Sequence, residues 1–208
     1  MRKLFLTSSA STVLHDVVNY FDKPVPGLKV AFIDTASEAE RGDLAWLDDD
    51  RDALVKQGFD VFDYSVTGKS YEEVSAALAT IDVLFVAGGN TFYLLEQANK
   101  CNFKKVVQNL LERDVVYIGS SAGSLLVCPN INPITFFDDP SKASELKSYD
   151  ALNLVDFIMF PHWGHERFKE RQMKSLESIY AEDYKIILLR DTQYIFVEDA
   201  TYKIMEIQ

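Results

Sequence analysis

The sequence has few of the residues that usually carry metal, redox or disulfide chemistry. Its two cysteines, Cys101 and Cys128, match neither a metal-binding nor a redox spacing. We therefore expect two free and buried thiols. Histidine is almost as scarce, with only His15, His162 and His165. A histidine-dependent reaction would have to use one of these three side chains.

Long apolar runs and positive charge are also lacking. No stretch approaches the roughly 20 apolar residues of a membrane span, and the apolar run at 4–6 is too short for a signal peptide. Lysine and arginine number 21 against 32 acidic residues, which gives a formal net charge of −11. This surplus argues against nucleic acid or an anionic membrane as a partner. We expect a cytoplasmic protein, either a monomer or a homodimer.

The remaining sequence is typical of one folded domain over residues 1–208, with 48% apolar and 25% charged residues. It has no internal repeat and no low-complexity tract. Short apolar runs alternate with amphipathic stretches, which predicts an α/β fold. Strands are expected at 4–7, 29–34, 60–64, 81–86, 115–118, 157–160 and 185–189, followed by a C-terminal antiparallel hairpin of 194–198 and 202–207. Helices are expected at 11–20, 37–57, 70–80, 92–98, 102–112, 122–127 and 166–181.

Helices between successive strands imply right-handed crossovers and a mainly parallel sheet with helices on both faces, in three α/β/α layers. Ligands of such sheets bind outside the carboxyl ends of the strands. Gly88–Asn90 and Ser121 both follow predicted strands, so we expect them at the same edge. The stretch 129–153 differs, because its prolines and charged residues predict a long loop with at most a hairpin.

The most informative motif is Gly119-Ser-Ser-Ala-Gly123, between a predicted strand and a predicted helix. Gly-x-Ser-x-Gly in this context is typical of a nucleophile elbow, a tight turn that lifts the serine oxygen clear of the sheet. Its spacing selects Ser121 as the nucleophile and aims the Ala122 N–H at the reacting carbonyl oxygen. The glycine turn Gly88–Asn90 on the neighbouring strand can supply a second oxyanion donor.

A serine hydroxyl needs a base, most often histidine. His162 is favoured because it ends a predicted strand at the edge where Ser121 projects, whereas His15 is expected on the surface of a helix. The pair His162 and His165 has a spacing compatible with a metal, but no cysteine or third histidine completes a usual zinc set. We expect no metal and no cofactor.

A triad also needs a carboxylate to orient the histidine. Asp191 follows the strand predicted at 185–189, again at the carboxyl edge. Asp138 and Asp139 in the long loop are the alternative, and the order serine, loop aspartate, histidine would match an α/β-hydrolase. The sequence leaves both choices open.

Taken in order, four segments resemble the peptidase E / cyanophycinase family of serine peptidases, over nearly the whole chain. They are Ala87-Gly-Gly-Asn-Thr-Phe92, Ser121-Ala-Gly123, Asp150-Ala-Leu-Asn-Leu154 and Phe160-Pro-His162. The resemblance implies a flavodoxin-like or class I glutamine amidotransferase-like fold rather than an α/β-hydrolase.

The same resemblance implies roles for individual residues. Ser121 would be the nucleophile and His162 the base, with the Gly89 and Ala122 amides as the oxyanion hole. Asp191 stands where members usually carry glutamate, and the loop aspartate proposed for peptidase E falls near Asp138 or Asp139. The family acts on Asp-X dipeptides or on a poly-aspartate backbone, which makes Asn90, Arg167 and Arg171 the candidates for binding an acidic substrate.

Three functions follow from these residues. The first is a cofactor-free serine exopeptidase that hydrolyses short peptides, Asp-X dipeptides among them, through an acyl-enzyme. The second is a serine esterase or amidase with Asp138 or Asp139 in the triad. The third is a catalytically silent binding protein whose glycine turn and elbow form an anion nest.

Overall fold

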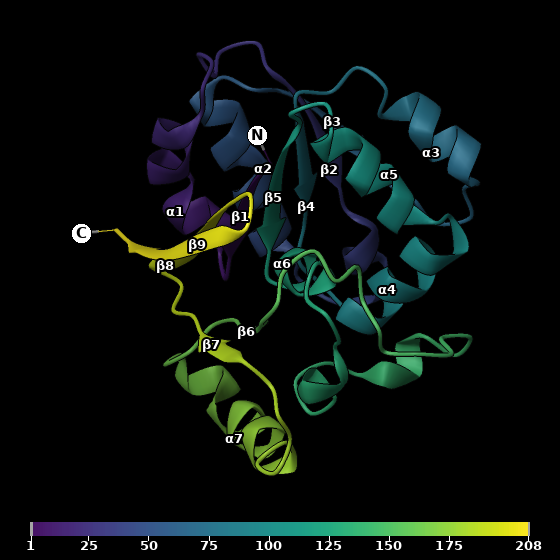
Figure 1. Cartoon of the computed structure of the whole chain (residues 1–208), viewed down its shortest axis with the longest axis vertical. Helices are drawn as coiled ribbons and strands as arrows, with labels where there is room; N and C mark the ends of the chain where they lie inside the picture. The colour runs from purple at the N-terminus through teal and green to yellow at the C-terminus, as the bar shows by residue number, and fades with distance from the viewer. Residues whose placement is uncertain (1, 208) are drawn as a thin grey trace.

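The computed structural model describes residues 2–207 and is built around a seven-stranded sheet (Figure 1). The strand order is β3-β2-β4-β5-β1-β8-β9. The strands are β1 (Lys3–Thr7), β2 (Lys29–Ile33), β3 (Asp60–Tyr64), β4 (Val83–Val86), β5 (Val116–Ser120), β8 (Gln193–Glu198) and β9 (Thr201–Glu206). The first five are mutually parallel, so their carboxyl ends share one edge. This confirms the predicted mainly parallel sheet.

Helices cover both faces of the sheet (Figure 1), which confirms the three-layer α/β/α prediction. Strand residues alternate between the layers: Val83 and Phe85 of β4 pack with α1 and α2, whereas Leu84 and Val86 pack with α4 and α5. The helices are α1 (Ala10–Val17), α2 (Ala45–Gln57), α3 (Tyr71–Ala77), α4 (Thr91–Lys100), α5 (Phe103–Leu111), α6 (Ala122–Leu126) and α7 (Lys169–Ser178).

Local signals set the helix ends. The left-handed Gly58, at φ 93°, ends α2, and Ser70 with Glu73 forms the capping box of α3. The helix predicted at 37–57 is wrong in its first part, because the chain forms a 3₁₀ turn at Thr35–Ala39 and begins α2 only at Ala45. Between them Gly42 has φ 101°, which no helix can accommodate.

The C-terminal region adds two pairs of strands. β8 runs antiparallel to β1 and forms the predicted hairpin with β9. β6 (Ile158–Phe160) and β7 (Ile186–Leu188) do not join the main sheet; they pair in parallel with each other, with α7 between them in the chain. Figure 1 shows these strands and α7 beyond the carboxyl ends of the main strands.

The predicted loop at 129–153 contains two 3₁₀ turns, Asn132–Ile134 and Pro140–Lys142, and one bridge between Asn130 and Asp150.

Both cysteines are free and buried, as expected, and burial raises the pKa of Cys128 to about 12. Within residues 2–207, the structure contains no helix with both the length and the apolarity required to traverse a lipid bilayer.

Candidate active site

Ser121 occupies a strained turn between β5 and α6. Its backbone angles are φ 48° and ψ −106°, a region that non-glycine residues rarely adopt, and its N–H donates to the Thr7 carbonyl at 2.9 Å. The flanking glycines are sterically required. A Cβ at Gly119 would lie 2.6 Å from the Ser124 nitrogen, and one at Gly123 would overlap the Val86 carbonyl oxygen. The geometry is that of a nucleophile elbow.

His162 reaches the serine from the segment that follows β6. Its Nε2 lies 3.1 Å from Ser121 Oγ, and its Nδ1 lies 2.6 Å from Asp191 Oδ1. The His162 side chain is 17% exposed and the Asp191 side chain 32%, so the imidazole is more shielded from water than the carboxylate. A continuous hydrogen-bonded line therefore joins a carboxylate, an imidazole and a hydroxyl, which is the arrangement of a serine hydrolase triad.

The pairing of β6 with β7 brings His162 and Asp191 together. Phe160 is opposite Leu188, and past the strand ends the Leu189 N–H donates to the Phe160 carbonyl at 2.9 Å. The Trp163 N–H donates in turn to the Leu189 carbonyl at 2.9 Å. The short aspartate side chain reaches the imidazole because both residues follow adjacent strand ends.

The loop aspartates have other partners. Asp138 Oδ2 accepts hydrogen bonds from the Thr91 N–H and hydroxyl, at the start of α4, and Asp139 Oδ1 accepts from the Ser141 N–H. Burial raises the pKa of Asp138 to about 6, and the bonds from Thr91 oppose that rise. The hydrogen bonds of Ser141 hold the pKa of Asp139 below its usual range. Of the three candidate carboxylates, Asp191 is the one hydrogen-bonded to His162.

The proposed oxyanion donors lie next to the serine. Ala122 is the first residue of α6, so its N–H has no acceptor inside that helix. Gly88 approaches the Ser121 side chain closely, since a Cβ there would be 3.4 Å from Ser121 Cβ. Gly89 has φ 127°, and a Cβ on it would be 2.6 Å from the Ser37 nitrogen. Only glycine fits this turn, and both of its glycines line the same cleft as Ser121.

A cleft of about 480 Å³ surrounds the Ser121 hydroxyl. Its lining includes every sequence-predicted site residue except Ala122, which is fully buried behind the nucleophile. Asn90 is already engaged: its oxygen caps α4 by accepting from the Tyr93 N–H, and its amide donates to the Asp139 carbonyl at 3.1 Å. Its main structural task is thus to hold the loop against α4.

The arginines stand on one wall of the cleft, with their guanidinium groups near the Phe168 ring. Arg167 is 5.6 Å and Arg171 5.4 Å from the ring centroid. Arg171 also donates to the Phe137 carbonyl at 3.1 Å. Across residues 2–207, neither arginine is paired with a carboxylate within salt-bridge distance, which leaves positive charge available to an acidic ligand.

Two aromatic residues that sequence reasoning missed hold the imidazole in place. The Phe168 ring stacks on His162 with centroids 4.9 Å apart and 24° between the planes, and the Phe137 ring is 6.3 Å away at 11°. No spacing signal in the sequence distinguishes these phenylalanines from core residues. Their packing fixes the ring plane while leaving both nitrogens in line with their partners.

Acidic residues also line the cleft, among them Asp49 and Asp50 of α2. Asp50 of α2 is almost completely buried and accepts from the Ser11 N–H at 2.7 Å. Burial raises the pKa of this carboxyl, while hydrogen bonds from Ser120 and Ser11 oppose the rise. The two other histidines lie outside the hydrogen-bonded line of Ser121, His162 and Asp191. His15 is exposed on α1, and His165 Nδ1 accepts from the Arg167 N–H.

The pair His162 and His165 finds no further metal ligands. In the part of the chain that the structure describes, no three His, Cys, Asp or Glu side chains are grouped so that they can hold a metal ion. His162 uses both ring nitrogens within the serine–aspartate line.

The sheet order, the elbow and the hydrogen-bonded line together define a serine hydrolase site on an α/β fold. The family model "Peptidase family S51" matches residues 4–205. The chain therefore belongs to peptidase family S51 and is a serine peptidase.

Individual relatives agree with this assignment. An uncharacterized peptidase of Listeria innocua is 36% identical over 202 residues, which cover 94% of this chain and 96% of the relative. Peptidase E of Escherichia coli is 33% identical over 141 residues, or 64% of this chain and 59% of that enzyme. A crystal structure of a Listeria monocytogenes protein, provisionally assigned to peptidase E, superposes with a TM-score of 0.91 at 32% identity and full coverage of both chains.

Proposed function

We propose that this peptidase hydrolyses short peptides, Asp-X dipeptides among them, through a triad of Ser121, His162 and Asp191. The observation that carries the proposal is the continuous line from Asp191 Oδ1 through the imidazole to Ser121 Oγ, with distances of 2.6 and 3.1 Å. Both distances are within the range for proton transfer between hydrogen-bonded groups. The residues that would act in each step are adjacent to the 480 Å³ cleft.

In acylation, His162 Nε2 takes the hydroxyl proton while Ser121 Oγ forms a bond to the scissile carbonyl carbon. The carbonyl π electrons move to oxygen, where the Gly89 and Ala122 N–H groups stabilise the negative charge. Asp191 stabilises the imidazolium through Nδ1. When the tetrahedral species collapses, the C–N bond breaks and the leaving amine takes the proton from His162, which leaves an ester on Ser121.

In deacylation, His162 takes a proton from water, and the hydroxide oxygen adds to the ester carbon. Collapse of this second tetrahedral species breaks the bond to Ser121 Oγ. The serine recovers the proton from His162. The acyl part of the substrate leaves as a free carboxylic acid, which for an Asp-X dipeptide is aspartate. No atom or electron has to come from a cofactor in either half of the reaction.

For the acidic side chain of an Asp-X substrate, we propose Arg167 and Arg171 as the positive partners. Both line the cleft, and the Phe168 ring contacts both guanidinium groups and also stacks on the His162 ring. An arginine fork matches the two oxygens of a carboxylate. Asn90 would contact the substrate through the part of its amide that α4 and Asp139 leave unused.

We also propose that residues 1–208 form one catalytic domain that acts on small peptides in the cytoplasm. The family match over 4–205 supports a single unit, and two buried free thiols suit a reducing compartment.

Reaction with a fluorophosphonate probe, followed by intact-mass spectrometry, tests the nucleophile. We expect one adduct on the wild type, none on Ser121→Ala, and one on Ser120→Ala, the adjacent serine whose hydroxyl accepts from the Ala10 N–H. A dipeptide panel of Asp-X, Ala-X and Leu-X then tests the substrate. A folded wild type that takes up no probe would overturn the proposed triad, and equal turnover of all three classes would overturn the Asp-X preference.

A further inference from the structure

The proposed triad is divided between two sheets. Ser121 follows β5 of the seven-stranded sheet, whereas His162 and Asp191 follow β6 and β7 of the separate two-stranded sheet. The 3.1 Å contact between Ser121 Oγ and His162 Nε2 therefore depends on how the two sheets are held relative to each other. An error of about 1 Å in such an alignment can cost about 100-fold in rate.

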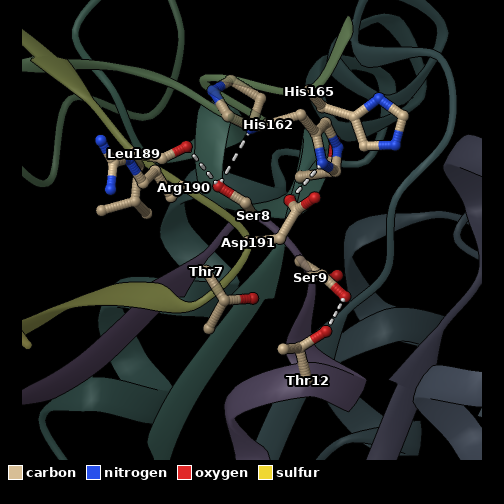
Figure 2. A network of polar contacts seen from close by, with 12 residues as sticks. Thr7, Ser8, Ser9, Thr12, His162, His165, Leu189, Arg190 and Asp191 are labelled. Carbon is tan, nitrogen blue, oxygen red and sulfur yellow. Dashed lines mark hydrogen bonds and ion pairs between the residues drawn. The ribbon is translucent and has the colours of Figure 1, made fainter. Parts of the chain in front are cut away.

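One buried hydroxyl connects the two sheets at this point. Ser8 directly follows β1 and is 1% exposed. Its Oγ donates to the Leu189 carbonyl at 2.9 Å and accepts from the His162 N–H at 3.1 Å (Figure 2). A hydroxyl can donate one hydrogen bond and can also accept. The Ser8 hydroxyl donates to the segment that carries Asp191 and accepts from the segment that carries His162.

The residue before Ser8 holds the nucleophile. The Thr7 carbonyl accepts from the Ser121 N–H at 2.9 Å, and the Thr7 N–H donates to Ser124 Oγ at 2.9 Å. Two consecutive residues at the end of β1 thus contact both halves of the site. Thr7 fixes the backbone of the elbow, and Ser8 fixes the backbone of His162.

The backbone of His162 needs such support. Its φ is 58°, in the left-handed region that costs a non-glycine residue about 1 kcal/mol or more. Its N–H points into the protein toward Ser8. Without that acceptor, a partly buried donor would be unpaired and the turn would lose one of the contacts that hold its unusual conformation.

We infer that Ser8 is a positioning residue, which sets His162 and Asp191 against Ser121 by tying both strand ends to β1. The inference rests on the proposed function of these three residues. Ser8 contacts no reacting atom. It acts through the His162 amide and the Leu189 carbonyl, two residues before Asp191.

The variant Ser8→Ala removes both hydrogen bonds. The Leu189 carbonyl still accepts from the Trp163 N–H, so the β6–β7 pairing survives. We expect kcat for dipeptides and the rate of fluorophosphonate labelling to fall about 10- to 100-fold, with KM changed less than about threefold. Ser8→Cys keeps the shape but donates weakly, and it should show the same loss even if the alanine variant is poorly folded.

Thr12→Ala is the matched control. Thr12 bonds to the neighbouring Ser9 hydroxyl on the first turn of α1, at 2.9 Å, and has no contact with His162 or Asp191 (Figure 2). We expect it to keep the wild-type labelling rate. Thermal unfolding of each variant shows whether a change in rate simply follows a loss of stability.

A double-mutant cycle separates positioning of the base from a general structural role. If Ser8 acts through His162, then Ser8→Ala should cause no further loss in residual labelling when added to His162→Ala. A proton NMR spectrum gives a second signature: the low-field His162 Nδ1–H resonance should shift or broaden in Ser8→Ala and be absent in Asp191→Asn.

The outcomes distinguish the two proposals. If Ser121→Ala labels like the wild type, the proposed function fails and the Ser8 inference fails with it. If the wild type labels at Ser121 but Ser8→Ala and Ser8→Cys label at the wild-type rate, only the inference is overturned. Additive losses in the His162→Ala background would also overturn it, because Ser8 would then act on the fold rather than on the base.

Discussion

His162 and Asp191 follow two parallel strands that pair residue for residue, with Phe160 opposite Leu188, and their side chains meet at 2.6 Å. The imidazole and the carboxylate thus both follow strands of the two-stranded sheet, whereas Ser121 follows a strand of the seven-stranded sheet. Because the strand ends are neighbours, a side chain as short as aspartate spans the gap. The carboxylate that is hydrogen-bonded to the His162 imidazole is therefore that of Asp191 and not one from the 129–153 loop.

Replacing Asp191 by asparagine should therefore disable the enzyme without unfolding it. The amide keeps the shape but cannot stabilise the imidazolium, and it favours the wrong histidine tautomer. We expect kcat for a dipeptide to fall by about 10³- to 10⁴-fold with little change in KM. Steady-state kinetics, with circular dichroism to monitor the fold, measures this.

Asp139→Asn is the control for that change, since Asp139 caps a 3₁₀ turn in the loop. It should alter kcat less than about threefold. A tenfold or smaller loss in Asp191→Asn, together with a large loss in Asp139→Asn, would move the triad carboxylate into the loop.

The elbow should not tolerate a methyl group at Gly123. A Cβ there would overlap the Val86 carbonyl of the adjacent strand, which is backbone and cannot rotate away as a flexible side chain would. We expect Gly123→Ala to destabilise the protein by about 3 kcal/mol or more, in the range of the severest core substitutions. Chemical denaturation measures the free energy of unfolding.

Gly68→Ala provides the comparison. Gly68 has φ 70°, and a Cβ added there would meet no atom within 4 Å, so only the backbone strain of about 1 kcal/mol applies. Equal losses in the two variants would mean that the elbow can move away from Val86.

Asp138 should make stability depend on pH in the acid range. Burial raises its folded pKa to about 6, above the unfolded value near 3.8. The contribution to stability is present in full below the unfolded pKa and is lost as pH rises through the folded one. Relative to Asp138→Asn, the wild type should therefore lose about 2 kcal/mol of unfolding free energy between pH 4 and 6, and only a few tenths of a kcal/mol more by pH 7.

Denaturant titrations of both proteins at pH 4, 5, 6 and 7 give this difference. A wild type that gains stability over the same interval relative to the variant would show that the carboxylate is favoured in the fold. Turnover should stay within about tenfold in Asp138→Asn, because its carboxyl contacts Thr91 rather than His162.

Much of the fold was accessible from sequence because the apolar runs are short and well separated. The capping box at Ser70 and the glycine at 58 set helix ends locally, and the structure confirms both. All four residues of β4 are buried, and they pack alternately against the two helical layers, which follows from the central position of this strand. The separate β6–β7 sheet was not accessible, because strand partners are chosen by distant contacts and not by local propensity.

The candidate site also has one part that the sequence predicts and another part that it does not. The elbow is a local motif, and its glycines and strained serine are as the spacing predicts. Two of the side chains that support His162, Ser8 and Phe137, are distant from it in the sequence, and the third, Phe168, follows it in the same segment. Ser8 is a polar residue directly after β1 at the carboxyl edge, and that position is the one signal in the sequence by which it could have been found.

Arg167 gives the sharpest test of substrate choice. Arg167 lines the cleft and has no carboxylate partner among the described residues. Arg171 also lines the cleft, but it donates a hydrogen bond to the Phe137 carbonyl. Arg167→Met keeps a long apolar side chain over Phe168 but removes the charge. A lost charge-assisted bond costs about 1.5 to 3 kcal/mol, so kcat/KM for Asp-X should fall about 10- to 100-fold and that for Ala-X should change little.

Lys169→Met, three positions from Glu166 and exposed, removes the same charge outside the cleft and should leave both substrates unaffected. If Arg167→Met lowered turnover of Asp-X and Ala-X equally, the arginine would serve the packing of Phe168 on His162. Selective loss of Asp-X turnover would instead mean that the guanidinium binds the substrate carboxylate directly, because a change in packing alone acts on the imidazole that both substrates share.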